Sequence, residues 1–249
     1  MSPVSEPKPK PFEISRSAVW EAYRRVKANK GAAGVDEQSI QEFEGDLHGN
    51  LYKLWNRLSS GSYFPPPVRA VEIPKKDGSS RTLGVPTVAD RIAQVVVRSY
   101  LEPSVGPVFH PDSYGYRPGR SAHDALRVCR ERCWRNDWVL DLDIRKFFDT
   151  VPWDLTLKAV AHHTDQRWIL LYVERWLKAP LQREDGTLVE RDRGTLRGRR
   201  SHPCSPTWSC TGRLMRGWRG SSRTSRLSAT ATTSSSTPEA SGRPCTCGP

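Results

Sequence analysis

Trp138-Val-Leu-Asp-Leu-Asp-Ile-Arg-Lys-Phe-Phe-Asp149 is the stretch that decides the fold, because it places acidic residues in an otherwise apolar strand pattern. A buried carboxylate is costly unless it is paired or bound to a metal, and Mg²⁺ prefers hard oxygen ligands. The alternative is an edge strand whose Asp141 and Asp143 face water, as the two-residue period of a strand allows. The pattern alone leaves both interpretations open.

Three further blocks precede this stretch. They are Val26-Lys-Ala-Asn-Lys-Gly-Ala-Ala-Gly-Val-Asp36, Pro67-Val-Arg-Ala-Val-Glu-Ile-Pro-Lys-Lys-Asp-Gly-Ser-Ser-Arg-Thr-Leu-Gly-Val-Pro-Thr-Val-Ala-Asp-Arg91 and Ser113-Tyr-Gly-Tyr-Arg-Pro-Gly-Arg-Ser-Ala-His-Asp-Ala-Leu126. Together with the Asp143 strand, they resemble the successive fingers and palm blocks of group II intron reverse transcriptases. The resemblance ends at Thr195, and four ordered blocks are more specific than any one of them.

The resemblance implies an α+β fold, with the fingers and a partial palm of a right-hand polymerase. We expect a disordered N-terminal arm at residues 1–16, the fingers at 17–135, the partial palm at 136–195 and a disordered low-complexity tail at 196–249. Local patterns agree, because apolar residues recur at helical or strand spacing between turn signals. They predict helices at 17–30, 39–59, 90–101, 122–134, 153–162 and 166–177, strands at 68–73 and 81–85, and a second hairpin at 181–188.

The resemblance places the catalytic acid at Asp143. Nucleotidyl transfer uses two Mg²⁺ ions, which activate the attacking primer oxygen and hold the leaving pyrophosphate. Asp143 is the candidate ligand of both ions, and the Ile144 carbonyl is the candidate backbone ligand. Asp141 is a partner only if its side chain points the same way, whereas we expect Asp149 to be a helix cap before Pro152.

Five further residues are candidates for contacts with the incoming dNTP or the template. Lys75 and Arg81 are spaced as in the family, on a hairpin that would bring both cations to the triphosphate. Phe148 corresponds to the ring that packs beneath the nucleotide sugar and excludes a 2′ hydroxyl, and Arg117, with Arg120, would lie near the template or nucleotide. The alternatives are a solvated face for the two cations, core packing for Phe148, and a structural turn around Arg117.

The basic charge of the chain is concentrated in its last part. The formal net charge is +12, yet residues 196–249 hold nine arginines against the single acid Glu239, which leaves +4 for residues 1–195. The same segment has no Ile, Val, Phe or Tyr and three leucines. Such a composition buries too little apolar area to offset chain entropy, so we expect disorder.

The sequence departs from the family pattern directly after Thr195. The family continues with Pro-Gln-Gly-Gly, a helix and a strand bearing Tyr-x-Asp-Asp, whereas this chain continues with Leu-Arg-Gly-Arg-Arg and has no Asp after Asp192. G+C-rich codons for residues 201–212, read one base earlier, spell Ser-Pro-Leu-Leu-Ala-Asn-Leu-Val-Leu-His-Arg. The same offset turns residues 229–237 into Tyr-Gly-Asp-Asp-Val-Val-Val-His. Two agreements at one offset indicate a frameshift near residue 196.

The sequence therefore indicates an RNA-directed DNA polymerase of the group II intron maturase type, truncated and catalytically inactive in this form. The resemblance implies Mg²⁺ as cofactor, and an RNA template, group II intron RNA, a DNA primer or target and dNTPs as partners. The alternatives are a non-catalytic RNA-binding remnant and a pseudogene product. No signal peptide or apolar span is present, so we expect a cytoplasmic protein without membrane contact.

Overall fold

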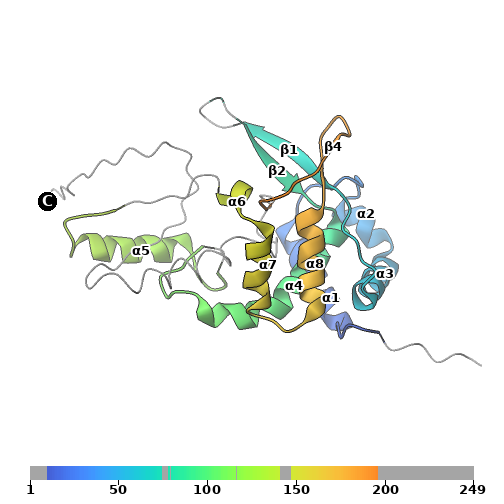
Figure 1. The fold of residues 1–249 in the computed structure, drawn as a ribbon, viewed down its shortest axis with the longest axis horizontal. Coiled ribbons are helices and arrows are strands. Elements are labelled where there is room, and N and C mark those ends of the chain that lie inside the picture. Colours follow the sequence, from blue (N-terminus) through green and yellow to red (C-terminus); the bar gives the residue numbers. More distant parts are fainter. Residues whose placement is uncertain (1–9, 75–77, 79, 116, 141–146, 196–249) are drawn as a thin grey trace, which may run out of the picture. The chain divides into compact units, whose positions relative to one another are not determined.

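The structure, a computed structural model of the 249-residue chain, describes residues 10–74, 78, 80–115, 117–140 and 147–195. The chain forms two compact units. Among the described residues, unit 2 lies within Val108–Phe147, and unit 1 consists of the residues before and after that stretch. Helices and short strands together give a mixed α and β fold (Figure 1).

The helices agree closely with the pattern of apolar residues. Their bounds are α1 (Arg16–Asn29), α2 (Ile40–Gly45), α3 (Leu47–Ser60), α4 (Val88–Val105), the 3₁₀ helix η1 (Gly106–Val108), α5 (Ala122–Cys133), α6 (Phe147–Thr150), α7 (Trp153–Ala161) and α8 (Arg167–Lys178). In α1, the buried side chains of Val19, Ala22, Tyr23 and Val26 recur at three- and four-residue spacing, which places them on one face. In the part of the chain that the structure describes, no helix is long and apolar enough to span a membrane.

One predicted helix is divided in two. We expected a single helix at residues 39–59, but α2 ends at Gly45 and α3 begins at Leu47. Asp46 lies between them with φ −128° and ψ 57°, and its Oδ1 accepts the Gly49 N–H at 3.1 Å. Because this carboxylate satisfies an N–H that lacks a helical partner at the start of α3, it stabilises a break that the apolar period does not reveal.

A second local prediction is also wrong. Asp149 lies within the short helix α6, and the N-cap of α7 is Pro152, which offers no side-chain acceptor. Proline is compatible with the start of a helix because its missing N–H would have no helical acceptor there. Asp149 is therefore not the cap of α7.

The four strands in the described part of the chain form one sheet in the order β2-β1-β3-β4. The strands β1 (Val68–Pro74) and β2 (Ser80–Val85) are antiparallel, as are β3 (Leu181–Gln182) and β4 (Leu188–Val189). Both hairpins were predicted from alternation and turn residues. The parallel pairing of β1 with β3, in which Val68 lies opposite Leu181, was not, because it joins segments far apart in the sequence.

Helix α4 forms the centre of unit 1 and contacts α1, α3 and α8 (Figure 1). A helix that is buried on nearly all sides needs apolar residues all round. Its fully buried apolar side chains are Val88, Ile92, Ala93, Val96, Val97 and Leu101. The same helix also buries the polar residues Asp90, Arg91 and Gln94, which no apolar stripe predicts.

The Gly-rich loop after α1 packs closely against the start of α4. Arg91 Nη2 donates to the Ala32 carbonyl at 3.0 Å. A Cβ atom on Gly34 would lie 2.6 Å from the Thr87 Cα and 2.7 Å from its backbone nitrogen. A side chain cannot be placed there without moving the backbone, so glycine allows the loop to contact the N-cap of α4.

Residues 10–15 belong to the segment expected to be an N-terminal arm, and the structure describes them packed against α3. The Phe12 N–H donates to the Ser59 carbonyl at 3.1 Å, and the Trp55 indole donates to the Ile14 carbonyl at 2.7 Å. Lys10 and Arg16 lie 3.4 and 4.3 Å from the centroid of the Trp55 ring, which is cation–π geometry. These contacts attach the chain to α3 before α1 begins.

Unit 2 contains α5, which begins with a capping box. The Ser121 N–H donates to the Asp124 carboxylate at 2.9 Å, and the Asp124 N–H donates to Ser121 Oγ at 3.2 Å. Arg132 Nη2 donates to Asp112 Oδ1 at 2.7 Å, which connects the helix to the segment that precedes it.

Candidate functional site

The β1–β2 hairpin carries the cation predicted to meet the nucleotide. Arg81 lies opposite Ile73 in the antiparallel register and is exposed. Paired residues project from the same face of a sheet, so Arg81 and the half-buried Ile73 share one face. The guanidinium is therefore accessible to an anion. Its predicted partner Lys75 lies outside the described residues.

Glu72, the acid within the two strands of this hairpin, projects from the opposite face. Glu72 pairs with Thr82, whose hydroxyl donates to Glu72 Oε1 at 2.6 Å. Hydrogen bonds from Thr82 and Ser80 lower the pKa of Glu72, and the charge of Arg183 adds to the effect. Because adjacent residues of a strand point to opposite faces, Glu72 does not neutralise Arg81.

The base of the hairpin is attached to the end of α8. The Val68 N–H donates to the Pro180 carbonyl at 2.9 Å, and Val68 lies opposite Leu181 of β3. Pro180 follows α8 by two residues. The position of α8 therefore determines where β1 begins.

Phe148 lies in α6 and is half-buried. Its carbonyl accepts the Thr195 N–H at 2.6 Å, and the Gly194 N–H donates to the Val151 carbonyl at 2.8 Å. Gly194 has a φ of +76°, and a Cβ atom there would lie 2.7 Å from the Asp149 carbonyl oxygen. The last described residues thus pack directly against the segment that carries Phe148.

The predicted template or nucleotide contacts in unit 2 each lie against an aromatic ring. Arg117 lies 4.6 Å from the Phe109 ring centroid, and Arg120 lies 5.4 Å from that of Tyr114. Burial lowers the pKa of Arg117, and the nearby charge of Arg120 adds to the effect. These contacts fit the structural turn that the sequence left open, and a role in nucleotide binding stays a prediction.

The predicted metal ligands Asp143 and Ile144 lie outside the described residues, as does Asp141. Within the ranges that are described, no group of three or more His, Cys, Asp or Glu residues could hold a metal ion. The assignment of Mg²⁺ to Asp143 therefore stays a prediction.

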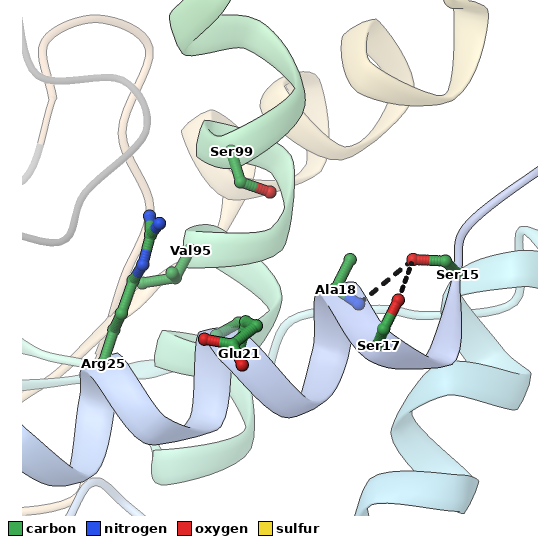
Figure 2. A pocket seen from close by; sticks show the side chains of 8 residues that line it. Ser15, Ser17, Ala18, Glu21, Arg25, Val95 and Ser99 are labelled. Atoms are coloured by element: carbon green, nitrogen blue, oxygen red, sulfur yellow. Dashed lines mark hydrogen bonds between the residues drawn. The ribbon is translucent and has the colours of Figure 1, made fainter.

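A hollow of ≈ 270 Å³ lies between α1 and α4. Figure 2 shows Glu21 and Arg25 of α1 at this hollow, together with Val95 and Ser99 of α4. Ser99 Oγ donates to the Val96 carbonyl at 2.7 Å. Of the described residues predicted to bind the nucleotide, neither Arg81 nor Phe148 lines this hollow.

Sequence reasoning missed a buried polar cluster centred on Asp90. This carboxylate is fully buried and accepts hydrogen bonds from Tyr63, Gln94 and Trp176. The signal was present, because Asp90, Arg91 and Gln94 interrupt a helix that is otherwise apolar on nearly all sides. The apolar spacing that predicts this helix gives no role to the polar residues within it.

The chain matches the family described as "Reverse transcriptase (RNA-dependent DNA polymerase)" over residues 73–204, which is more than half of its length. Protein YkfC of Escherichia coli K12 is 39% identical over 161 residues, which cover 61% of this chain and 42% of YkfC. The group II intron-encoded protein LtrA of Lactococcus lactis subsp. cremoris is 35% identical over 133 residues, covering 52% of this chain and 22% of LtrA. The chain thus spans less than half the length of these relatives.

A solved structure, the partial Cas6-RT-Cas1–Cas2 complex, contains a chain of similar fold. The two superpose with a TM-score of 0.50 at 22% sequence identity, over 82% of this chain and 33% of that one. At this identity the similarity concerns the fold alone.

Proposed function

Because this chain belongs to the group II intron reverse transcriptases and maturases, we propose that it comprises the fingers and the beginning of the palm of an RNA-directed DNA polymerase. Residues 17–135 are the proposed fingers, and residues 136–195 the proposed partial palm. The observation that carries this proposal is the exposed Arg81 on the β1–β2 hairpin, within the segment that matches the family.

In the proposed reaction, a primer 3′ oxygen attacks a dNTP on an RNA template and releases pyrophosphate. Lys75 and Arg81 would bind the triphosphate, because cations offset its negative charge. The ring of Phe148 would lie beneath the sugar, where a 2′ hydroxyl would collide with it, and Arg117 would contact the nucleotide or template.

The proposed metal ligands are the Asp143 carboxylate and the Ile144 carbonyl. Mg²⁺ would supply positive charge at the attacking and leaving oxygens. Two divalent ions in one site repel each other and need several oxygen ligands, whereas Asp143 is one carboxylate. The Tyr-x-Asp-Asp pair expected after Thr195 is absent from this sequence, where residues 196–249 instead fit an out-of-frame reading. We infer that the chain in this form does not polymerise DNA.

Primer extension tests this inference. The purified chain, incubated with Mg²⁺, dNTPs and a primer annealed to an RNA template, is expected to yield no product above a no-enzyme background. An active group II intron reverse transcriptase assayed in parallel shows that the template is competent. Robust extension by this chain would contradict the inference, and resequencing the gene around codon 196 independently tests the change of frame.

A non-catalytic RNA-binding role is the second candidate, because residues 196–249 carry nine arginines and one acid. Phosphate contacts release counterions, so electrostatic binding weakens linearly in a plot of log affinity against log salt concentration. Deleting residues 196–249 is expected to lower RNA affinity and to reduce that slope by roughly 0.7 per lost phosphate contact to single-stranded RNA. Filter binding across a salt series measures both quantities.

The same series separates specific from non-specific binding. If unit 1 recognises intron RNA, the deletion variant keeps its preference for that RNA over an unrelated RNA of equal length. An unchanged salt slope would show that the tail makes no phosphate contacts. If neither the full chain nor the deletion variant prefers intron RNA over the unrelated RNA, the pseudogene interpretation is favoured.

A further inference from the structure

The buried Asp90 carboxylate joins three segments of unit 1. Its Oδ1 accepts the Tyr63 hydroxyl at 2.8 Å and the Trp176 indole N–H at 2.6 Å, and its Oδ2 accepts the Gln94 amide at 2.9 Å. Tyr63 precedes β1, Gln94 lies in α4 and Trp176 lies in α8. All four side chains are less than 5% exposed. A buried carboxylate whose two oxygens are both hydrogen-bonded holds the segments of its donors in one arrangement.

The hydrogen bonds to this carboxylate come from neutral side chains. Among the charged or titratable residues of neighbouring elements, Arg57 of α3 and Tyr172 of α8 act on the Tyr63 hydroxyl, and Arg175 of α8 donates to the Tyr63 carbonyl. Arg91 of α4 donates to the Ala32 carbonyl instead. Burial raises the pKa of Asp90 to about 6, against the opposing effect of its three hydrogen bonds. The carboxyl group therefore changes its protonation state near neutral pH.

Both protonation states can be hydrogen-bonded. Among the described residues, Gln94 Oε1 is buried and has no hydrogen-bond partner. A rotation of this amide by half a turn would present Oε1 to Asp90 Oδ2, where it can accept the proton of the neutral acid. Tyr63 and Trp176 can donate to Oδ1 in either state, so the connection between their segments does not depend on ionisation.

These two segments are the ones that enter the sheet beside each other. Arg175 Nη1 donates to the carbonyls of Gly61 at 2.8 Å and Tyr63 at 2.5 Å, which holds the segment before β1 against α8. The chain leaving α8 then accepts the Val68 N–H at Pro180 and continues into β3. Displacing Tyr63 from Trp176 would move the start of β1 relative to β3.

We propose that Asp90 is a positioning residue for the β1–β2 hairpin, because it fixes the segment that enters β1 to the helix from which β3 leaves. This inference rests on the proposed function only in that the hairpin is the part that would meet the nucleotide. The positioning itself is a property of the protein alone.

The first measurement follows the Trp176 indole N–H by NMR in the ¹⁵N-labelled full chain, with Trp176→Phe to assign the resonance. We expect its chemical shift to titrate with a midpoint near the pKa of Asp90, about 6. The titration is expected to disappear in Asp90→Asn and to persist in Asp46→Asn, which changes an exposed carboxylate. A Trp176 resonance that does not move through this pH range would contradict the contact.

The second measurement is deuterium uptake in peptides that contain β1 and β2. Loss of one buried hydrogen bond is expected to speed exchange at the base of the hairpin about tenfold in Tyr63→Phe, which conserves shape. Trp176→Phe removes the other hydrogen bond and also part of a buried ring, so its exchange is expected to speed up by at least about tenfold. Asp90→Asn keeps a carbonyl acceptor and is expected to retain near-native exchange. Asp90→Ala has no acceptor and is expected to exchange faster. Peptides of α5, in unit 2, are the internal reference.

Unchanged exchange at β1 and β2 in the Tyr63→Phe and Trp176→Phe variants would overturn the proposal, and these two remain informative if Asp90→Ala does not fold. No nucleotide or RNA is present in either measurement. A failure of the proposed function would appear in the extension and RNA-binding assays and would leave these results unaffected.

Discussion

Replacing Gly34 with alanine is expected to lower the free energy of unfolding by about 3 kcal/mol, at the upper end of the range for overpacked sites. The added Cβ would lie 2.6 Å from the Thr87 Cα and 2.9 Å from its Cγ2. Main-chain atoms cannot rotate away as the end of a side chain can. Thr87 is also the N-cap of α4, because its Oγ1 accepts the Asp90 N–H at 3.2 Å. Relief of the clash would therefore disturb the central helix.

Gly45→Ala is the matched control, since nothing lies within 4 Å of the Cβ atom that it would add. Gly45 is the last residue of α2, and alanine favours a helix by up to about 1 kcal/mol over glycine. Urea unfolding followed by circular dichroism gives the midpoint of both variants. Equal midpoints for Gly34→Ala and Gly45→Ala would show that the loop is not packed against Thr87.

The stability contributed by Asp90 is expected to fall by about 3 kcal/mol as the pH rises from about 4 to about 8, because a pKa shift of two units corresponds to that free energy. Burial raises the pKa of Asp90 from 3.8 to about 6. Between these values the folded chain retains a proton that the unfolded chain has released. The contribution is therefore complete below pH 3.8 and is lost as the pH rises through about 6.

The difference between wild type and Asp90→Asn isolates this contribution, because asparagine has the same shape and does not titrate here. In urea unfolding across the pH series, the free energy of unfolding of Asp90→Asn is expected to rise relative to that of the wild type as the pH rises. A flat difference for Asp90→Asn would mean that the carboxylate is solvated in the folded protein.

The elements that carry Arg81 could be predicted from the sequence alone. Alternation and the Lys76-Asp-Gly-Ser-Ser80 turn placed Arg81 on the second strand of a hairpin, and the structure confirms that hairpin. The nucleotide-binding roles of Lys75, Arg81, Phe148 and Arg117 stay predictions, as do the metal-binding roles of Asp143 and Ile144. The family could be recognised because its motifs are runs of consecutive residues, which can be seen in a single sequence without the structure.

Two local errors show where periodicity misleads. The apolar period continues through Asp46, so it could not reveal that this residue ends α2 and caps α3. Asp149 has the residue type of a cap, yet α7 begins at Trp153 after Pro152 without one. In both places, backbone hydrogen bonding rather than the pattern of apolar residues determined the boundary.

The sequence by itself determined most of the helices, the two hairpins, their order, and the family to which the chain belongs, because these depend on neighbouring residues and on blocks read in order. Residues 138–140, expected in a strand, lie in no strand that the structure describes, and Phe147–Thr150 form α6. Only the tertiary structure decided that β1 pairs with β3, that Gly34 contacts Thr87, and that Asp90 joins Tyr63 to Trp176. The spacing of apolar residues predicts which face of a helix or strand is buried, but not which other element covers that face. Contacts between distant segments form where several faces pack together, and there a polar residue such as Asp90 can be enclosed once its partners are in place.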